Sequence, residues 1–173
     1  MLPPKKSRRG DSLLEAATEY IAKSRYPNTC VIDFFPLGSD ERQYCSPGVN
    51  LPFCSLMHSV YGTFKEYHTS LDNKSYISFE VIQQSTEDLY DVIRILENDG
   101  RYFNQMPMCE PQLGKRGLYP TISKVTDAMM WILNYSDGKH TLFDILKKAQ
   151  LPIGSFLEAK DVLIKNGILK YEE

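Results

Sequence analysis

The residues best suited to chemistry lie in two polar loops, and the second of these along the chain contains a histidine. His68 stands between Tyr67 and Thr69, with Asp72 four residues further on. An imidazole is a good zinc ligand when a neighbour orients its second ring nitrogen. A single loop histidine is more often structural or merely exposed, and spacing alone favours that simpler interpretation.

The other polar loop carries the adjacent carboxylates Asp40 and Glu41, followed by Arg42. Such carboxylates can bind a metal, activate water or hold a substrate ammonium group. A solvated turn with a local ion pair is the simpler interpretation. His58 and His140 have no partner pattern, so we expect no chemistry from either. The sequence contains no GxSxG, no HExxH and no glycine-rich phosphate motif.

The elements that must position these loops alternate between helix and strand. Ser12 and Glu15 have the spacing of a capping box and predict the first helix. Residues 30–35 and 53–57 are short apolar runs typical of strands, and a polar loop follows each. A long helix over 79–98 comes next, with an apolar stripe of Ile82, Leu89, Val92, Ile93 and Leu96. In an open α/β sheet, sites lie at the carboxyl ends of strands, where both loops fall.

The last fifty residues are typical of three short helices and a closing strand. Thr141 can cap the second helix, and Ile153 begins the third. Proline and glycine concentrate in 101–120, which we interpret as a linker. The sequence therefore predicts an α/β domain over 1–100 and a winged helix-turn-helix domain over 121–173.

Composition narrows the range of functions. The chain has 173 residues, 42% of them hydrophobic and 24% charged, with a net charge of -2. This profile is typical of a soluble globular protein and argues against one dominated by nucleic-acid or membrane electrostatics. Without a signal-peptide core or a run of about 18 apolar residues, we expect a cytoplasmic protein with no membrane span. We expect the basic residues within 5–9 (KKSRR) to form a solvated loop.

Three strings resemble stretches of the bacterial zinc aminopeptidase-like family that carries a C-terminal winged helix-turn-helix domain. They are 39–52 (SDERQYCSPGVNLP), 66–73 (EYHTSLDN) and 110–120 (EPQLGKRGLYP). The resemblance covers nearly the whole chain but only the C-terminal part of that family's proteins. It implies the C-terminal part of a three-layer α/β exopeptidase domain with two co-catalytic zinc ions, followed by the winged helix. Such proteins are often linked to surface polysaccharide synthesis.

The resemblance also implies roles for individual residues. His68, in a His-Thr-x-x-Asp setting, matches the family's last zinc-binding histidine. Asp40 and Glu41 match acidic residues that face the active-site cleft, and these are the implied catalytic carboxylates. The residues implied to line the cleft and bind substrate are Arg42, Tyr44 and Tyr67.

Most of the family's zinc ligands lie upstream of the segment that this chain resembles. A catalytic zinc site needs about three protein ligands plus water. We therefore expect weak or absent zinc binding and little or no peptidase activity from the chain alone, and a peptide-like substrate for the complete enzyme. A missing front half would leave a sheet edge and an apolar face exposed, which predicts self-association or a partner that supplies that half.

Two other functions stay open. The first is a winged-helix regulator that binds DNA or protein. Between Ser123 and Glu173, seven lysines are balanced by seven acidic residues, and the third helix carries Glu158 and Asp161 beside Lys160 and Lys165. Because nucleic-acid readers usually present a basic face, this balance argues against DNA as a partner. The second is a non-catalytic interaction protein that kept the fold and lost the chemistry.

Overall fold

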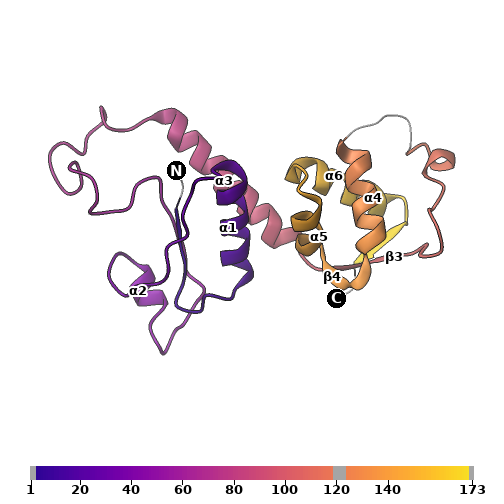
Figure 1. Cartoon of the computed structure of the whole chain (residues 1–173), viewed down its shortest axis with the longest axis horizontal. Coiled ribbons are helices and arrows are strands. Elements are labelled where there is room, and N and C mark those ends of the chain that lie inside the picture. The colour runs from indigo at the N-terminus through magenta and orange to yellow at the C-terminus, as the bar shows by residue number, and fades with distance from the viewer. Residues whose placement is uncertain (1–2, 119–123, 172–173) are drawn as a thin grey trace. The chain divides into compact units, whose positions relative to one another are not determined.

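The chain folds as two compact units, which divide between Leu96 and Glu97. The structure, a computed structural model, describes residues 3–118 and 124–171 (Figure 1). The first unit contains both polar loops, and the second contains the three short helices predicted near the C-terminus.

The first unit mixes helices with very short strands. Its elements are β1 (Pro4–Lys5), α1 (Leu13–Arg25), α2 (Glu41–Tyr44), β2 (Ser55–Leu56) and α3 (Phe79–Asn98), the last of which ends just past the division. The predicted first and long helices are confirmed. The short helix α2 interrupts the segment that was expected to be an irregular loop.

Strand β1 lies at the centre of the pairing in this unit. Lys5 pairs with Ser55 of β2 in antiparallel register and, on its other side, with Ile32 through a single parallel bridge. Of the predicted strand over 53–57, only Ser55 and Leu56 form a strand. Of the predicted strand over 30–35, Ile32 makes a single bridge. These pairings support a mixed helix and strand unit, and a three-layer α/β domain stays a proposal.

Helix α1 begins with the predicted capping box, and the box is part of a larger network. Ser12 Oγ accepts from the Glu15 backbone N–H, and Glu15 Oε2 accepts from the Ser12 N–H at 2.8 Å. The other carboxylate oxygen, Oε1, accepts from both Ser7 N–H and Ser7 Oγ at 2.7 Å. Because Glu15 is buried, its charge ties the preceding loop to the helix.

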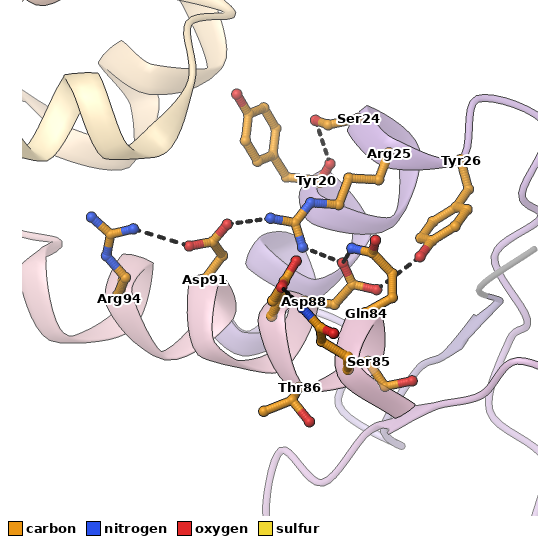
Figure 2. Close-up of polar contacts among 12 residues, drawn as sticks. Tyr20, Ser24, Arg25, Tyr26, Gln84, Ser85, Thr86, Asp88, Asp91 and Arg94 are labelled. Atoms are coloured by element: carbon orange, nitrogen blue, oxygen red, sulfur yellow. Dashed lines mark hydrogen bonds and ion pairs between the residues drawn. The ribbon is translucent and has the colours of Figure 1, made fainter. Parts of the chain in front are cut away.

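Helices α1 and α3 meet through charged side chains (Figure 2). The Arg25 guanidinium on α1 forms ion pairs with Asp88 and Asp91, one turn apart on α3. The Tyr26 hydroxyl donates to Asp88 Oδ2 at 3.1 Å. Asp88 is fully buried, so these contacts decide which face of α3 turns toward α1.

The apolar stripe predicted for α3 is divided between two faces. Val92 is buried on the same side as Asp88, whereas Ile82, Leu89 and Ile93 are exposed. Among the described residues, no helix is long and apolar enough to cross a bilayer.

The second unit is a winged helix-turn-helix domain in which three helices pack on a three-stranded sheet. Its helices are α4 (Lys124–Tyr135), α5 (Leu142–Ala149) and α6 (Ile153–Lys165), and its strands are β3 (Arg101–Asn104), β4 (Asp137–Thr141) and β5 (Leu169–Tyr171). The strand order is β4-β3-β5, with antiparallel pairs. The predicted cap at Thr141 is confirmed, since its side chain accepts from the Asp144 N–H.

The predicted linker 101–120 therefore contains part of this domain. It includes β3 and the short 3-10 helix η1 (Leu113–Arg116). Its last two residues lie outside the described part of the chain.

The core of the second unit is apolar and closely packed. Helix α4 packs against α6, where Ala128 and Ala159 are both fully buried and allow the helix backbones to approach. Ile132 on α4 and Phe156 and Leu163 on α6 are also fully buried. Burial of such side chains is the main source of stability in a small domain.

Replacing the largest fully buried side chain of this core should destabilise the second unit strongly. Phe156→Ala leaves a cavity between α4 and α6, and we expect a loss of about 3–5 kcal/mol. Urea unfolding followed by the fluorescence of Trp131, the single tryptophan of the chain, measures the loss in this unit. The matched control is Phe79→Ala, because Phe79 is 81% exposed and its truncation should change stability by less than about 0.5 kcal/mol. Equal effects of the two changes would contradict the assigned core.

Removing the charge of Glu15 should destabilise the first unit in a pH-dependent way. Burial alone would raise the pKa of Glu15, but hydrogen bonds from Ser12 and Ser7 outweigh burial and lower the pKa below 4.5. A lowered pKa gives stability that is present above pH 4.5 and is lost as the pH falls through the folded-state value. We expect Glu15→Gln to cost about 1–3 kcal/mol at pH 7, and less at pH 4 and below.

Urea titrations followed by circular dichroism at pH 7 and in a series below pH 4.5 measure this difference. Glu19→Gln is the matched control on the same helix, since the ion pair of Glu19 is with Lys23, whose side chain is 55% exposed. Its cost should stay below about 1 kcal/mol at every pH. A Glu15→Gln penalty that does not change with pH would contradict the proposed role of the charge.

Candidate functional site

The candidate site is built around a buried ion pair that the sequence analysis did not predict. Lys5 Nζ donates to Glu41 Oε1 at 2.6 Å, to the Leu37 carbonyl at 3.1 Å and to Tyr61 Oη at 2.8 Å. The Tyr61 hydroxyl donates to Glu41 Oε1 at 3.0 Å. Lys5 also lies 3.7 Å from the centre of the Phe35 ring, a favourable cation–π contact. We call these residues the Lys5–Glu41 cluster.

Full burial of Lys5 corrects the expectation that the basic residues near the N-terminus form a solvated loop. Its relative exposure is 0%, and that of Glu41 is 1%. The basic string gave no signal for this burial, because lysines beside other lysines and arginines are usually solvated. Lys5 is buried because it lies in β1, and its ammonium group is compensated by Glu41.

Both members of the ion pair keep their charge at neutral pH. Burial alone would lower the pKa of Lys5, but the hydrogen bonds to Glu41 and Tyr61 outweigh it and raise the pKa above 10.5. Burial alone would raise the pKa of Glu41, and the bond from Lys5 outweighs it and lowers the pKa below 4.5. A carboxylate held in this way is a weak proton acceptor, so the geometry favours a positioning role for Glu41.

The turn before α2 accepts no side chain at one position. Gly38 has φ +135°, and a Cβ atom there would lie 2.1 Å from Tyr61 Oη and 2.8 Å from Glu41 Oε1. Both the backbone angle and the close approach exclude larger residues. Glycine at this position therefore lets the Lys5–Glu41 cluster close.

A row of aromatic rings leads from this cluster to His68. The Tyr61 ring centre lies 6.4 Å from that of Phe35 and 6.5 Å from that of Tyr67. The Tyr67 ring stacks on the His68 imidazole, with centres 4.0 Å apart and planes 15° apart. Of the predicted site residues, the structure thus connects Glu41, Tyr67 and His68 through these contacts.

The loop that carries His68 is shaped by successive turns. The Thr69 hydroxyl donates to the Glu66 carbonyl at 3.0 Å, and the Asp72 N–H donates to the Thr69 carbonyl at 3.1 Å. His68 itself is exposed and has φ +57°, a left-handed conformation that costs a residue with a side chain about 1–2 kcal/mol. Strain of this kind is frequent at functional sites and motivates the hypothesis that the imidazole is held for a purpose.

The remaining predicted residues lie on or beside α2. Asp40 is exposed at the start of the helix, and its side chain makes no capping bond. Arg42 is also exposed. Tyr44 stacks on Phe53, with ring centres 4.7 Å apart. The catalytic role of Asp40 and the substrate-binding roles of Arg42 and Tyr44 therefore stay predictions.

The described residues do not by themselves fit a catalytic zinc ion. Within 3–118 and 124–171, no three His, Cys, Asp or Glu side chains are grouped closely enough to hold a metal. His140 Nδ1 lies 3.1 Å from Asp137 in the second unit, and His58 Nε2 is buried without a hydrogen-bond partner. His68 is thus at most one ligand of such a site.

Helix α6, which would enter a DNA groove, carries surface charges of both signs. Glu158, Asp161 and Lys165 are exposed on it. Lys160 is buried, where its ammonium group donates to Asn98 Oδ1 at 2.6 Å and pairs with Asp161 at 2.8 Å. The helix therefore has no uniformly basic face, and the absence of DNA binding stays a prediction.

The chain is similar to known proteins across both units. Residues 2–99 match the family model of a domain of unknown function, DUF4910, and residues 100–171 match a winged helix-turn-helix family. The second match agrees with the helices and strands described above and confirms the predicted winged helix.

Two similar proteins come from Clostridium acetobutylicum. One, named "Putative polysaccharide biosynthesis protein with aminopeptidase-like domain", is 42% identical over 172 residues, which cover 96% of this chain and 39% of that protein. The other is the crystal structure of a protein named as a "putative peptidase", with 40% identity and a TM-score of 0.85 over 99% of this chain and 39% of that one. The chain therefore spans about two fifths of the length of these relatives. By its match over residues 2–99, the chain belongs to the DUF4910 family.

Proposed function

We propose that this chain is the C-terminal part of a zinc-dependent, aminopeptidase-like hydrolase. The observation that carries the proposal is the presentation of His68, strained at φ +57° and stacked on Tyr67, in a chain 42% identical to a protein named for an aminopeptidase-like domain. In this proposal the first unit is one portion of a three-layer α/β domain, and the rest of that domain completes the site.

His68 would provide a single zinc ligand. Its exposed imidazole stacks on the Tyr67 ring, and turns shape the loop that carries it. In the complete site a hydrogen-bond partner for the second ring nitrogen would also be needed. The described residues supply no group of three ligands, so the remaining ligands would have to come from outside the described residues. We therefore propose no reaction step for the isolated chain.

The neighbouring residues would shape the cleft for a peptide-like substrate. Glu41 and Lys5 position the Tyr61 hydroxyl through hydrogen bonds. The Tyr61 ring lies next to that of Tyr67, which stacks on His68, the proposed zinc ligand. Asp40 is exposed whereas Glu41 is buried, and so Asp40 is the better candidate of the two for holding a substrate ammonium group or for proton transfer. Arg42 and Tyr44 would contribute to substrate binding from α2.

A hybrid protein tests whether His68 binds zinc. In the hybrid, this chain replaces the matching 39% of the Clostridium acetobutylicum relative. We expect bound zinc in the hybrid, measured by elemental analysis after dialysis, and loss of at least about half of it in His68→Ala, because a ligand contributes strongly to affinity. The matched control is His140→Ala, which should keep the full zinc content. A hybrid without zinc, or one whose zinc does not depend on His68, would overturn the proposal and favour a non-catalytic interaction protein.

Because the backbone of His68 is left-handed, we expect that replacing it with glycine removes zinc binding without lowering the stability of the chain. Glycine adopts φ +57° without penalty, so His68→Gly should leave the full chain as stable as the native protein or stabilise it by up to about 1 kcal/mol. The same change should remove zinc from the hybrid as completely as His68→Ala does. Urea unfolding of the full chain measures the stability. A destabilisation above about 1 kcal/mol would mean that the imidazole serves the fold instead.

A further inference from the structure

Helix α3 presents an apolar stripe to solvent. Phe79, Ile82, Leu89 and Ile93 are 81%, 48%, 51% and 53% exposed. At about 100° per residue, their spacing of three, seven and four places them on one face, with Thr86 between them. We call these four residues the α3 stripe.

The opposite face of α3 is the one already in use. Asp88 and Asp91 bind Arg25 there, and Val92 and Ile95 are buried beside them. A surface helix normally turns its apolar face inward and its charged residues outward. Here Asp88 and Asp91 face α1 while four large apolar side chains face solvent, and contiguous exposed apolar surface of this kind marks an interaction site.

We propose that the α3 stripe is a docking surface for the part of the aminopeptidase-like protein that lies outside the region matched by this chain. This inference rests on the proposed function and names the partner that would complete its site. In the related crystal structure, the same fold occupies 39% of a longer chain, so roughly three fifths of that chain is available to cover the stripe. Among its described residues, the first unit has only short strand pairings. The partner that covers the stripe would enlarge the fold of this unit.

The share of the related chain outside the match is what favours the rest of the protein as the occupant over a second copy of this chain. Helical spacing places Glu80 and Glu87 roughly 120° or more around α3 from the centre of the stripe, so their charges do not decide between the two. A second copy is therefore the competing outcome of the test.

Co-expression tests this assignment. The full chain, carrying an affinity tag, is produced together with the segment of the Clostridium acetobutylicum relative that lies outside the match. We expect the two to co-purify and to sediment as a 1:1 complex. The double change Leu89→Glu with Ile93→Glu should raise the dissociation constant at least about 30-fold, because buried apolar anchors dominate an interface. Both side chains are exposed, so the thermal unfolding of the full chain should stay unchanged.

Val81→Glu is the matched control, since Val81 is an exposed apolar residue of α3 outside the stripe. It should change the dissociation constant by less than about threefold. A segment that stays separate or insoluble on co-expression overturns the docking proposal. So does a dimer of the full chain that Leu89→Glu dissolves, because a second copy would then cover the stripe.

Formation of the complex is measured by its mass in the absence of zinc, so the docking proposal and the zinc-site proposal can fail independently. A complex that depends on the stripe, together with a hybrid that lacks zinc, would retain the docking surface and reject the zinc site. A hybrid whose zinc depends on His68, together with no complex between separate chains, would retain the site and reject the docking surface.

Discussion

The arrangement of the first unit depends on the contact of Arg25 with Asp88 and Asp91 (Figure 2). Two carboxylates one turn apart on α3 share one guanidinium from α1, and Tyr26 adds a hydrogen bond to the same Asp88. A planar guanidinium binds two carboxylates with a defined geometry, which a point charge on lysine would not impose. The contact therefore fixes the rotation of α3 about its own axis. The apolar stripe is turned to solvent as a direct consequence.

The interior of each unit is stabilised by a different kind of interaction. The second unit has a continuous apolar core in which Phe156, Ile132 and Leu163 are fully buried. In the first unit, the largest fully buried side chains include Lys5, Glu41 and Asp88. A buried ion pair contributes less net stability than apolar packing, because desolvation offsets much of its attraction, but loss of one partner is costly. The first unit is thus specific in its geometry while it buries little apolar surface of its own, as expected for a fold that gains more from a covering partner.

Local signals in the sequence were sufficient for the helices and insufficient for the strands. The Ser12 and Thr141 caps and the long run of 79–98 were predicted because capping and helical periodicity are properties of neighbouring residues. Strand β3 fell inside the predicted linker, since its four residues become a strand only by pairing with β4 and β5. The direction in which α3 faces was not predictable either, because it depends on Arg25, far away in the sequence.

The candidate site shows the same division. Tyr67 and His68 were found from a resemblance between strings, and the structure adds their stacking and the strained backbone. Lys5 gave no signal, because burial of a lysine depends on a distant carboxylate that only the fold brings close. Glu41 was predicted as a carboxylate of interest, but its partner changes what it can do. A carboxylate that already accepts two hydrogen bonds positions other groups better than it takes up protons.

The charges of the second unit bear on what its winged helix can do. On α6, Glu158, Asp161 and Lys165 are exposed, whereas Lys160 is turned inward toward Asn98. The sheet also carries exposed cations, at Arg101, Lys139 and Lys170. Because α6 carries charges of both signs, it lacks the uniformly basic face that a nucleic-acid reader usually presents. DNA therefore stays the less favoured proposal for a partner, and protein the more favoured one.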